Sequence, residues 1–378
     1  MFKEGELHMQ QYPVRTIDLE ALRENVRLLR STLPEKTKLM AVVKADAYGH
    51  GIAKVARAAL EAGASALAVA RTDEGAALRQ AGVTAPVLVL GASSDEEIAE
   101  GVRNELTLTV CTPEMVDTLE SCAKDSGLTG LMHLKIDTGM GRIGVRTEEE
   151  IRAILARLQV SPHVRLTGAF THFADADGSD MAYTRMQFER FQQLLTLLPD
   201  GIVRHCANSG AVLSWRDKGA ALDLVRPGLL TYGVYPDSER GGLSLTPVMA
   251  LKSRVSAITH HKKGDSISYG RTWTAERDCT LAVLPVGYAD GLQRCLSGKL
   301  EVLLRGKRVK QVGRICMDMC MLDVTDIPDA AVGDVVTVFG CGDDGAPTVA
   351  ELAALAGTIP YELLCGVSLR VPRIYTEN

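Results

Sequence analysis

A lysine at the end of a short apolar run is the first residue in this sequence that could carry chemistry. Residues 40–51 read M-A-V-V-K-A-D-A-Y-G-H-G, so Lys44 closes an apolar segment and a loop follows at once. Taking a lysine ammonium group out of water costs several kcal/mol unless the group is paired or chemically altered. A desolvated lysine can form a Schiff base with an aldehyde. The alternative is a lysine whose stem lies along the strand end while its ammonium group reaches water.

The chain that carries this lysine alternates between short apolar runs and amphipathic segments. Asp18 is a candidate N-cap for the first amphipathic segment, because its side chain can accept from free backbone N–H groups. The pattern predicts strands at residues 38–43, 65–70, 86–90, 107–110, 131–136, 165–172, 202–206 and 221–225, with helices between them. Eight strands separated by helices over about 200 residues predict an α/β fold, a (β/α)8 TIM barrel.

The pattern of apolar residues changes after the predicted barrel. Residues 232–245 are typical of a linker, and beyond them apolar residues alternate with period two between Gly/Asp turns. We therefore expect a C-terminal mostly-β domain with one helix near residues 349–356. The predicted domains are residues 12–240 for the barrel and 241–378 for the β-domain, and a first strand at 12–17 could join the latter.

Polar residues follow five of the eight predicted strands. Barrel enzymes place catalysis at these carboxyl ends. The candidates are Lys44 and Tyr48, Lys135 and Arg142, His172, Ser209 and Gly210, and Arg226 and Gly228. Singly, each has an ordinary alternative as a core histidine, a helix cap or a turn residue. Together, a lysine, a phosphate cradle at a helix start, an arginine and a histidine describe an aldehyde that carries a phosphate and an aromatic ring, namely pyridoxal 5′-phosphate (PLP).

Composition excludes several other classes of protein. Lys+Arg of 42 against Asp+Glu of 47 gives a net charge of −5, so nucleic acid is not an expected partner. The amino terminus has no apolar core for a secretory signal, and no run is long enough for a membrane helix. Nine cysteines without a C-x-x-C pair indicate reduced thiols and a cytoplasmic protein. No His or Cys spacing supports a metal site.

Nine motifs, in order along nearly the whole chain, closely resemble those of the alanine racemase family. They are A-V-V-K-A-D-A-Y-G-H-G, D-T-G-M-G-R-I-G, H-C-A-N-S, V-R-P-G, S-Y-G-R-T, P-V-G-Y-A-D-G, V-G-R-I-C-M-D-M, P-Y-E-L-L-C and R-V-P-R. The resemblance implies a PLP-dependent homodimer that interconverts L- and D-alanine and supplies D-alanine for peptidoglycan.

The same resemblance assigns roles to individual residues. Lys44 would bind the cofactor and act as one base, and Tyr269, supplied by the partner subunit, would be the opposite base. Arg226 would meet the pyridine nitrogen and His172 would pack against the ring. The phosphate would be held by Tyr48, Ser209, Gly228 and Tyr361. Arg142 and the backbone of Met317 would hold the substrate carboxylate, and Lys135 stands where many members carry a carbamylated lysine.

Chemistry agrees with this assignment but leaves rivals open. Racemisation removes a proton from one face of Cα and returns it to the other, so it needs two bases. A PLP-dependent decarboxylase should pair the pyridine nitrogen with an acid, where this sequence offers Arg226. A non-catalytic PLP-binding protein would not need the second domain or Tyr269. A serine/alanine racemase is a closer rival, against which Tyr361 favours the small methyl side chain.

Overall fold

The computed structural model describes residues 12–178, 180–215, 219–236, 242–342 and 344–377. The chain divides into two compact units. Of the described residues, the barrel unit contains those within 22–47 and 51–245, and the sheet unit contains those within 12–21, 48–50 and 246–377. The expected linker shows no strand after Tyr232 in its described part, and its residues 237–241 lie outside the described residues.

Eight parallel strands close the barrel unit in sequence order. They are β2 (Lys38–Val42), β3 (Ala66–Val69), β4 (Val87–Ala92), β5 (Thr107–Val110), β6 (Gly130–Lys135), β7 (Val164–Phe170), β8 (Val203–His205) and β9 (Leu224–Val225). The last strand returns to the first through the pairs Lys38–Leu224 and Leu39–Val225. Every strand predicted from the sequence is present, and the TIM barrel is confirmed. Strands buried on both faces read as unbroken apolar runs, which is why the sequence located them.

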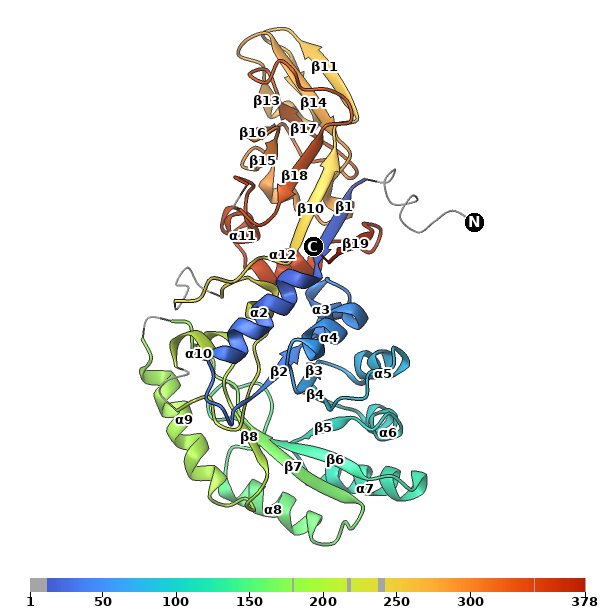
Figure 1. Cartoon of the computed structure of the whole chain (residues 1–378), viewed down its shortest axis with the longest axis vertical. Helices are drawn as coiled ribbons and strands as arrows, with labels where there is room; N and C mark the ends of the chain where they lie inside the picture. The colour runs from blue at the N-terminus through green and yellow to red at the C-terminus, as the bar shows by residue number, and fades with distance from the viewer. Residues whose placement is uncertain (1–11, 179, 216–218, 237–241, 343, 378) are drawn as a thin grey trace. The chain divides into compact units, whose positions relative to one another are not determined.

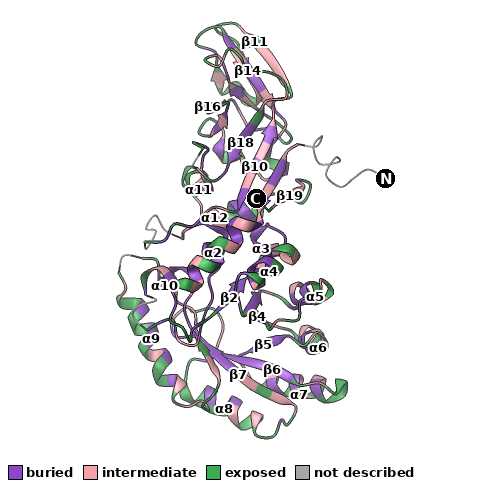
Figure 2. Ribbon diagram, viewed as in Figure 1, coloured by how far each residue is buried: buried purple, intermediate pink, exposed green. Residues whose placement is uncertain are grey.

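Helices form the outer layer of this unit (Figure 1). They are α2 (Leu19–Ser31), α4 (Ile52–Glu61), α5 (Thr72–Gln80), α6 (Asp95–Arg103), α7 (Pro113–Ser126), α8 (Glu148–Leu158), α9 (Ala182–Leu195) and the short α10 (Ser209–Ser214). Asp18 caps α2 as predicted, since its Oδ1 accepts from the N–H groups of Glu20 and Ala21 at 3.0 Å each. On α6, Ser94 Oγ and Glu97 form a reciprocal capping box. The barrel strands are mostly buried, although β7 begins with intermediate and exposed residues, while the helices expose one face (Figure 2).

The sheet unit is built on nine strands in the order β11-β14-β17-β16-β15-β18-β10-β1-β19. Their bounds are β1 (Val14–Asp18), β10 (Met249–Arg254), β11 (Ala257–His261), β14 (Cys279–Leu284), β15 (Glu301–Leu304), β16 (Lys307–Val312), β17 (Cys320–Asp323), β18 (Val335–Phe339) and β19 (Arg373–Thr376). β1 pairs antiparallel with β10 and parallel with β19, so the first and last described strands lie in one sheet. The mostly-β second part is confirmed. Helix α11 (Val349–Ala356) matches the prediction, and α12 (Pro360–Gly366) is a further helix that was not predicted from the sequence.

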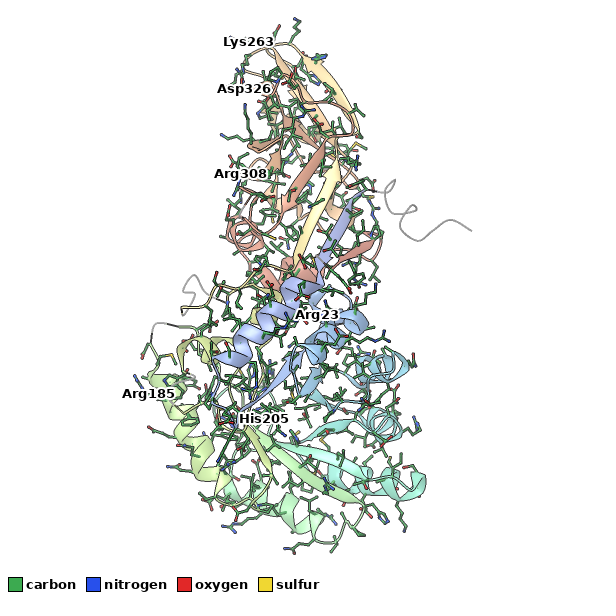
Figure 3. All side chains as sticks on the ribbon, viewed as in Figure 1. Arg23, Arg185, His205, Lys263, Arg308 and Asp326 are labelled. Atoms are coloured by element: carbon green, nitrogen blue, oxygen red, sulfur yellow. The ribbon has the colours of Figure 1, made fainter. Side chains whose placement is uncertain are left out.

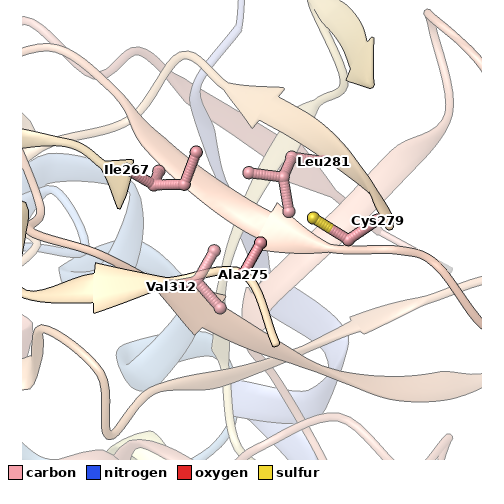
Figure 4. Close-up of a cluster of buried hydrophobic side chains, with 5 residues drawn as sticks. All are labelled: Ile267, Ala275, Cys279, Leu281 and Val312. Atoms are coloured by element: carbon pink, nitrogen blue, oxygen red, sulfur yellow. The ribbon is translucent and has the colours of Figure 1, made fainter. Parts of the chain in front are cut away.

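A small cluster of buried side chains holds a hairpin against this sheet. The hairpin pairs β12 (Ser266–Ile267) with β13 (Trp273–Thr274). The cluster consists of Ile267, Ala275, Cys279, Leu281 and Val312 (Figure 4). Burying a large aliphatic side chain such as Ile267, Leu281 or Val312 contributes about 1.5–3 kcal/mol. The cluster therefore fixes the segment between the two short strands, which carries Tyr269.

No single helix in the described ranges is long and apolar enough to span a membrane. Only α11 and α12 taken together pass on length and composition, and they are bent by 103°.

Candidate active site

Lys44 begins a left-handed turn two residues after β2. In this turn, α3 (Lys44–Tyr48), the φ/ψ angles are 52°/51° at Ala45, 52°/47° at Asp46 and 55°/49° at Ala47. Tyr48 also has a positive φ of 51°. Each non-glycine residue in this conformation costs about 1–2 kcal/mol, because Cβ crowds the following carbonyl oxygen. Other interactions must therefore hold the turn.

Carboxylates supply much of that support. Glu74, in the first turn of α5, accepts from the N–H of Ala45 at 2.5 Å through Oε1, and from that of Ala70 at 2.7 Å through Oε2. Asp46 Oδ1 accepts from the N–H of Ile52 at 2.8 Å. The peptide that follows Lys44 is thus tied to the neighbouring strand-helix connection. Glu74 was not among the residues predicted from the sequence, where its only visible signal is its place near a helix start.

Arg226 lies directly after β9 and is almost fully buried, at 3% exposure. Its Nη2 donates to the carbonyl oxygens of Thr171 at 2.8 Å and Cys206 at 3.2 Å, and lies 3.4 Å from His172 Nδ1. Its Nη1 donates to His205 Nδ1 at 2.7 Å. Burial lowers the pKa of Arg226 to about 10, so the guanidinium stays charged at neutral pH. In the part of the chain that the structure describes, no carboxylate hydrogen-bonds to it.

Positive charge gathers around His172. Burial lowers the pKa of His172 well below its usual range, and the charges of Arg226, Arg142, Lys135 and Lys44 lower it further, in that order. His172 is therefore a neutral imidazole at physiological pH. These cations are close enough to influence one side chain, as the shared strand-end location predicts.

Lys135 ends β6 in a buried, cationic setting. Its Nζ donates to the carbonyl oxygen of Ile136 at 2.9 Å and lies 5.5 Å from the centre of the Phe170 ring. Burial lowers the pKa of Lys135 to about 8; Arg226 and Arg142 also lower it, and Asp137 opposes them. A lysine in these surroundings has an accessible neutral form.

The loop after Lys135 is shaped by one carboxylate. Asp137 Oδ1 accepts from the N–H groups of Gly139 at 3.0 Å and Gly141 at 3.1 Å. These bonds fold the glycine-rich turn that carries the exposed Arg142.

Ser209 and Gly228 meet at the ends of β8 and β9. Ser209 Oγ accepts from the N–H of Gly228 at 2.9 Å, and Asn208 caps α10 by accepting from Ala211 at 3.1 Å. A Cβ on Gly210 would lie 3.0 Å from Ala176 and Asp177 backbone atoms, so glycine allows this close approach. Two strand-end loops are thereby joined at the position predicted for a phosphate.

The remaining candidates belong to the sheet unit. The rings of Tyr48 and Tyr361 lie 5.7 Å apart with a 53° tilt. The carbonyl oxygen of Gly49 accepts from Arg15 Nη1 at 3.1 Å and from Arg373 Nε at 3.0 Å. The loop tip that carries Tyr48 is therefore clamped by arginines from the first and last strands of the described chain.

Tyr269 is 72% exposed and Met317 is 53% exposed. Ser268, which has a positive φ of 66°, donates through Oγ to the carbonyl oxygen of Arg314 at 2.9 Å. A shallow pocket of about 410 Å³ opens beside Tyr269, lined by Cys316, Met319 and neighbouring residues. The tyrosine thus projects from a fixed turn at the rim of an apolar depression.

Seven predicted site residues follow barrel strands in the barrel unit, and four lie in the sheet unit. The first group is Lys44, Lys135, Arg142, His172, Ser209, Arg226 and Gly228; the second is Tyr48, Tyr269, Met317 and Tyr361.

Sequence comparison agrees with both halves of this architecture. The family model described as "Alanine racemase, N-terminal domain" matches residues 17–236, and "Alanine racemase, C-terminal domain" matches residues 248–375. The chain belongs to the alanine racemase family. Among curated members, the alanine racemase of Desulforamulus reducens is 45% identical over 366 residues, covering 95% of this chain and 97% of its own. Alanine racemase 1 of Bacillus subtilis is 43% identical, covering 96% of this chain and 92% of its own.

Solved structures of the family have the same fold. The alanine racemase from Bacillus anthracis with bound L-Ala-P is 39% identical with a TM-score of 0.90, covering 97% of this chain and 95% of that one. The enzyme from D-cycloserine-producing Streptomyces lavendulae is 36% identical with a TM-score of 0.92, covering 97% and 98%. The family resemblance drawn from the motifs is confirmed.

Proposed function

We propose that this protein interconverts L-alanine and D-alanine, using PLP and two bases on opposite faces of the substrate Cα. The observation that most supports this proposal is that Arg226, which carries only hydrogen-bond donors, is buried at the carboxyl end of a barrel strand. The family match supplies the reaction, and the side chains at the strand ends supply a matching set of groups.

The residues present fit PLP. Of the five N–H groups of Arg226, the bonds described above use one at Nη1 and both at Nη2. One N–H at Nη1 and the one at Nε then have no partner among the described residues, which suits an aromatic nitrogen that accepts a hydrogen bond. A guanidinium cannot accept a proton, so it would keep that nitrogen unprotonated. The decarboxylase alternative needs an acid there, and none hydrogen-bonds to Arg226 in the described ranges.

Other residues would complete the cofactor site. We assign the phosphate to Tyr48, Ser209, Gly228 and Tyr361, and the face of the ring to His172, whose neutral imidazole can pack without adding charge.

The chain's own groups would then handle substrate and proton. When bound, PLP supplies an electron-withdrawing ring that makes the α-proton of an amino acid acidic. Arg142 and the backbone N–H of Met317 would hold the substrate carboxylate. Lys44 Nζ would take or return the α-proton on one face, and the Tyr269 hydroxyl would do so on the other.

Tyr269 requires a second subunit in this proposal. Its high exposure, together with exposed Met317, Met319 and Tyr288, gives the sheet unit a group of large apolar side chains that a partner could cover. We propose a homodimer in which each site receives Tyr269 of the partner subunit.

We also propose a cytoplasmic protein whose D-alanine serves peptidoglycan synthesis. All nine cysteines are free thiols, which supports a reducing compartment.

The direct test is an assay of the purified protein with L-alanine and with L-serine, measuring D-product. We expect D-alanine, and borohydride treatment should attach the cofactor to the peptide that holds Lys44. A Lys44→Ala protein that still fixes cofactor at this site would refute the role of Lys44. Greater activity on serine would favour the serine/alanine racemase alternative.

A second test addresses the two faces. Tyr269→Phe should block racemisation yet still exchange the α-proton of one alanine enantiomer with solvent deuterium. Mixing Lys44→Ala with Tyr269→Phe subunits, under conditions where subunits exchange, should restore activity in heterodimers. Demonstrated heterodimers without restored activity would place both bases in one chain.

A further inference from the structure

Two buried histidines line up behind Arg226 in the barrel interior. His205 Nδ1 lies 2.7 Å from Arg226 Nη1, and His205 Nε2 lies 2.9 Å from His133 Nδ1. His133 comes from β6, and His205, which is labelled in Figure 3, comes from β8. The two histidines are 7% and 0% exposed. Neither has a role in the proton transfers described above.

The hydrogen bonds in this row have a forced direction. Arginine carries only donors, so His205 Nδ1 must accept and cannot carry a hydrogen. In neutral His205 the hydrogen then lies on Nε2, which donates to His133 Nδ1. His133 in turn carries its own hydrogen on Nε2. Because Arg226 carries only N–H donors, it sets the tautomers of both histidines.

The surroundings keep both imidazoles neutral and in place. Burial, followed by the charge of Arg226, lowers the pKa of His133 to about 3 and that of His205 well below its usual range. The Phe170 ring stacks on His205 at 4.9 Å with an interplanar angle of 3°. His205 therefore has little freedom to rotate or to change its donor pattern.

We propose that His205 and His133 are positioning residues that fix the guanidinium of Arg226 through a one-directional hydrogen-bond chain. His205 takes one N–H of Nη1, while the carbonyl oxygens of Thr171 and Cys206 take those of Nη2. The remaining two N–H groups then have one orientation. Without the acceptor on His133, the Nε2 hydrogen of His205 would be buried without a partner, and a shift of that hydrogen to Nδ1 would oppose Arg226.

The test compares two substitutions at His133, which does not touch Arg226. His133→Asn keeps an acceptor near the position of Nδ1, whereas His133→Leu removes it at similar size. Nitrogen-15 NMR of histidine-labelled, full-length protein without added substrate reports which ring nitrogen is protonated. Signals are assigned from their loss in His133→Asn and His205→Asn.

We expect the wild-type protein to show hydrogen on Nε2 of both histidines. His133→Leu should shift the nitrogen-15 signal of His205 Nε2, because its hydrogen loses its acceptor, while His133→Asn should leave that signal near its wild-type position. Hydrogen on Nδ1 of wild-type His205, or an imidazolium there, would overturn the proposal, and this measurement stands even if His133→Leu does not fold.

The kinetic consequence rests on the proposed function. In metal sites, removing a residue that orients a ligand typically lowers metal affinity or activity about 10–100-fold, and we take the lower end of that range as the expected loss here. We expect His133→Leu to lower kcat about tenfold with KM for alanine unchanged, and His133→Asn to recover most of it. Equal kcat for the two variants would refute the positioning role. The expected tautomers in a wild-type protein that does not racemise alanine would count against the proposed function alone.

Discussion

Lys135 should be carbamylated in the working protein, and the structure gives the size of the effect that favours it. Carbamate forms from the neutral amine and CO2. With a pKa of about 8 instead of 10.5, the neutral fraction at pH 7 is about one in eleven instead of about one in three thousand. Burial thus raises the reactive population about 300-fold. The product would place a negative charge near Arg142 and Arg226, where the ammonium form is repelled.

Stability measurements separate the modified lysine from the free one. A free Lys135 whose pKa is about 8 in the folded state instead of 10.5 would cost that state on the order of 3 kcal/mol below pH 8. That cost disappears as pH rises toward 10.5, because the unfolded chain then also loses its proton. For a free lysine, Lys135→Met should therefore raise the free energy of unfolding at pH 7. For a carbamate, the same substitution should lower it.

The assay is carbon-13 NMR with labelled bicarbonate, alongside urea unfolding. We expect a bicarbonate-dependent carbamate signal that Lys135→Met abolishes and that Lys38→Met, at an exposed lysine, leaves intact. No such signal, together with a Lys135→Met protein about 3 kcal/mol more stable at pH 7, would refute the reasoning.

Three further outcomes follow from described contacts. Glu74→Gln should lower the free energy of unfolding by about 1–3 kcal/mol and also lower kcat. Glu97→Gln, in the capping box of α6, should leave kcat unchanged. Equal kcat for the two variants would contradict the role of Glu74 in supporting the turn after Lys44. Gly49 and Gly82 share a φ of +82°, but only at Gly49 would a Cβ lie 2.5 Å from a carbonyl oxygen. Gly49→Ala should therefore lower the free energy of unfolding in urea by about 2 kcal/mol more than Gly82→Ala does. The pKa of His133 is about 3 in the folded protein, so below pH 6.5 the folded protein binds fewer protons than the unfolded chain. This difference should lower the free energy of unfolding by about 3 kcal/mol at pH 4.5. His133→Asn should remove that loss.

Local patterns were enough to locate the barrel and its strand ends. Each barrel strand is an apolar run in a chain with one repeating order, so Lys135 and Arg226 could be placed at strand ends before any contact was known. The helix at Val349–Ala356 was found because eight residues carry a helical pattern. The seven residues of α12 are too few for a reliable period, and the two-residue strands β12 and β13 have none.

Other features had no local signal. The left-handed turn after Lys44 is made of alanine, aspartate and tyrosine, which give no reason to expect positive φ angles. His133 and His205 are 72 residues apart, and only closure of the barrel brings their rings together. Glu74 resembles any acidic residue near a helix start, whereas its partner lies 29 residues away.

The sheet that contains both β1 and β19 has a consequence for how the protein is made. Arg15 on β1 donates to the carbonyl oxygen of Val367, across 352 residues of sequence. During synthesis the barrel sequence is available early, since domains generally fold as they emerge from the ribosome. β1 depends on partners far along the sequence, because it pairs with β10 on one edge and with β19 on the other. Until β19 has been made, one edge of β1 therefore stays unpaired, and this edge should need protection in the nascent chain.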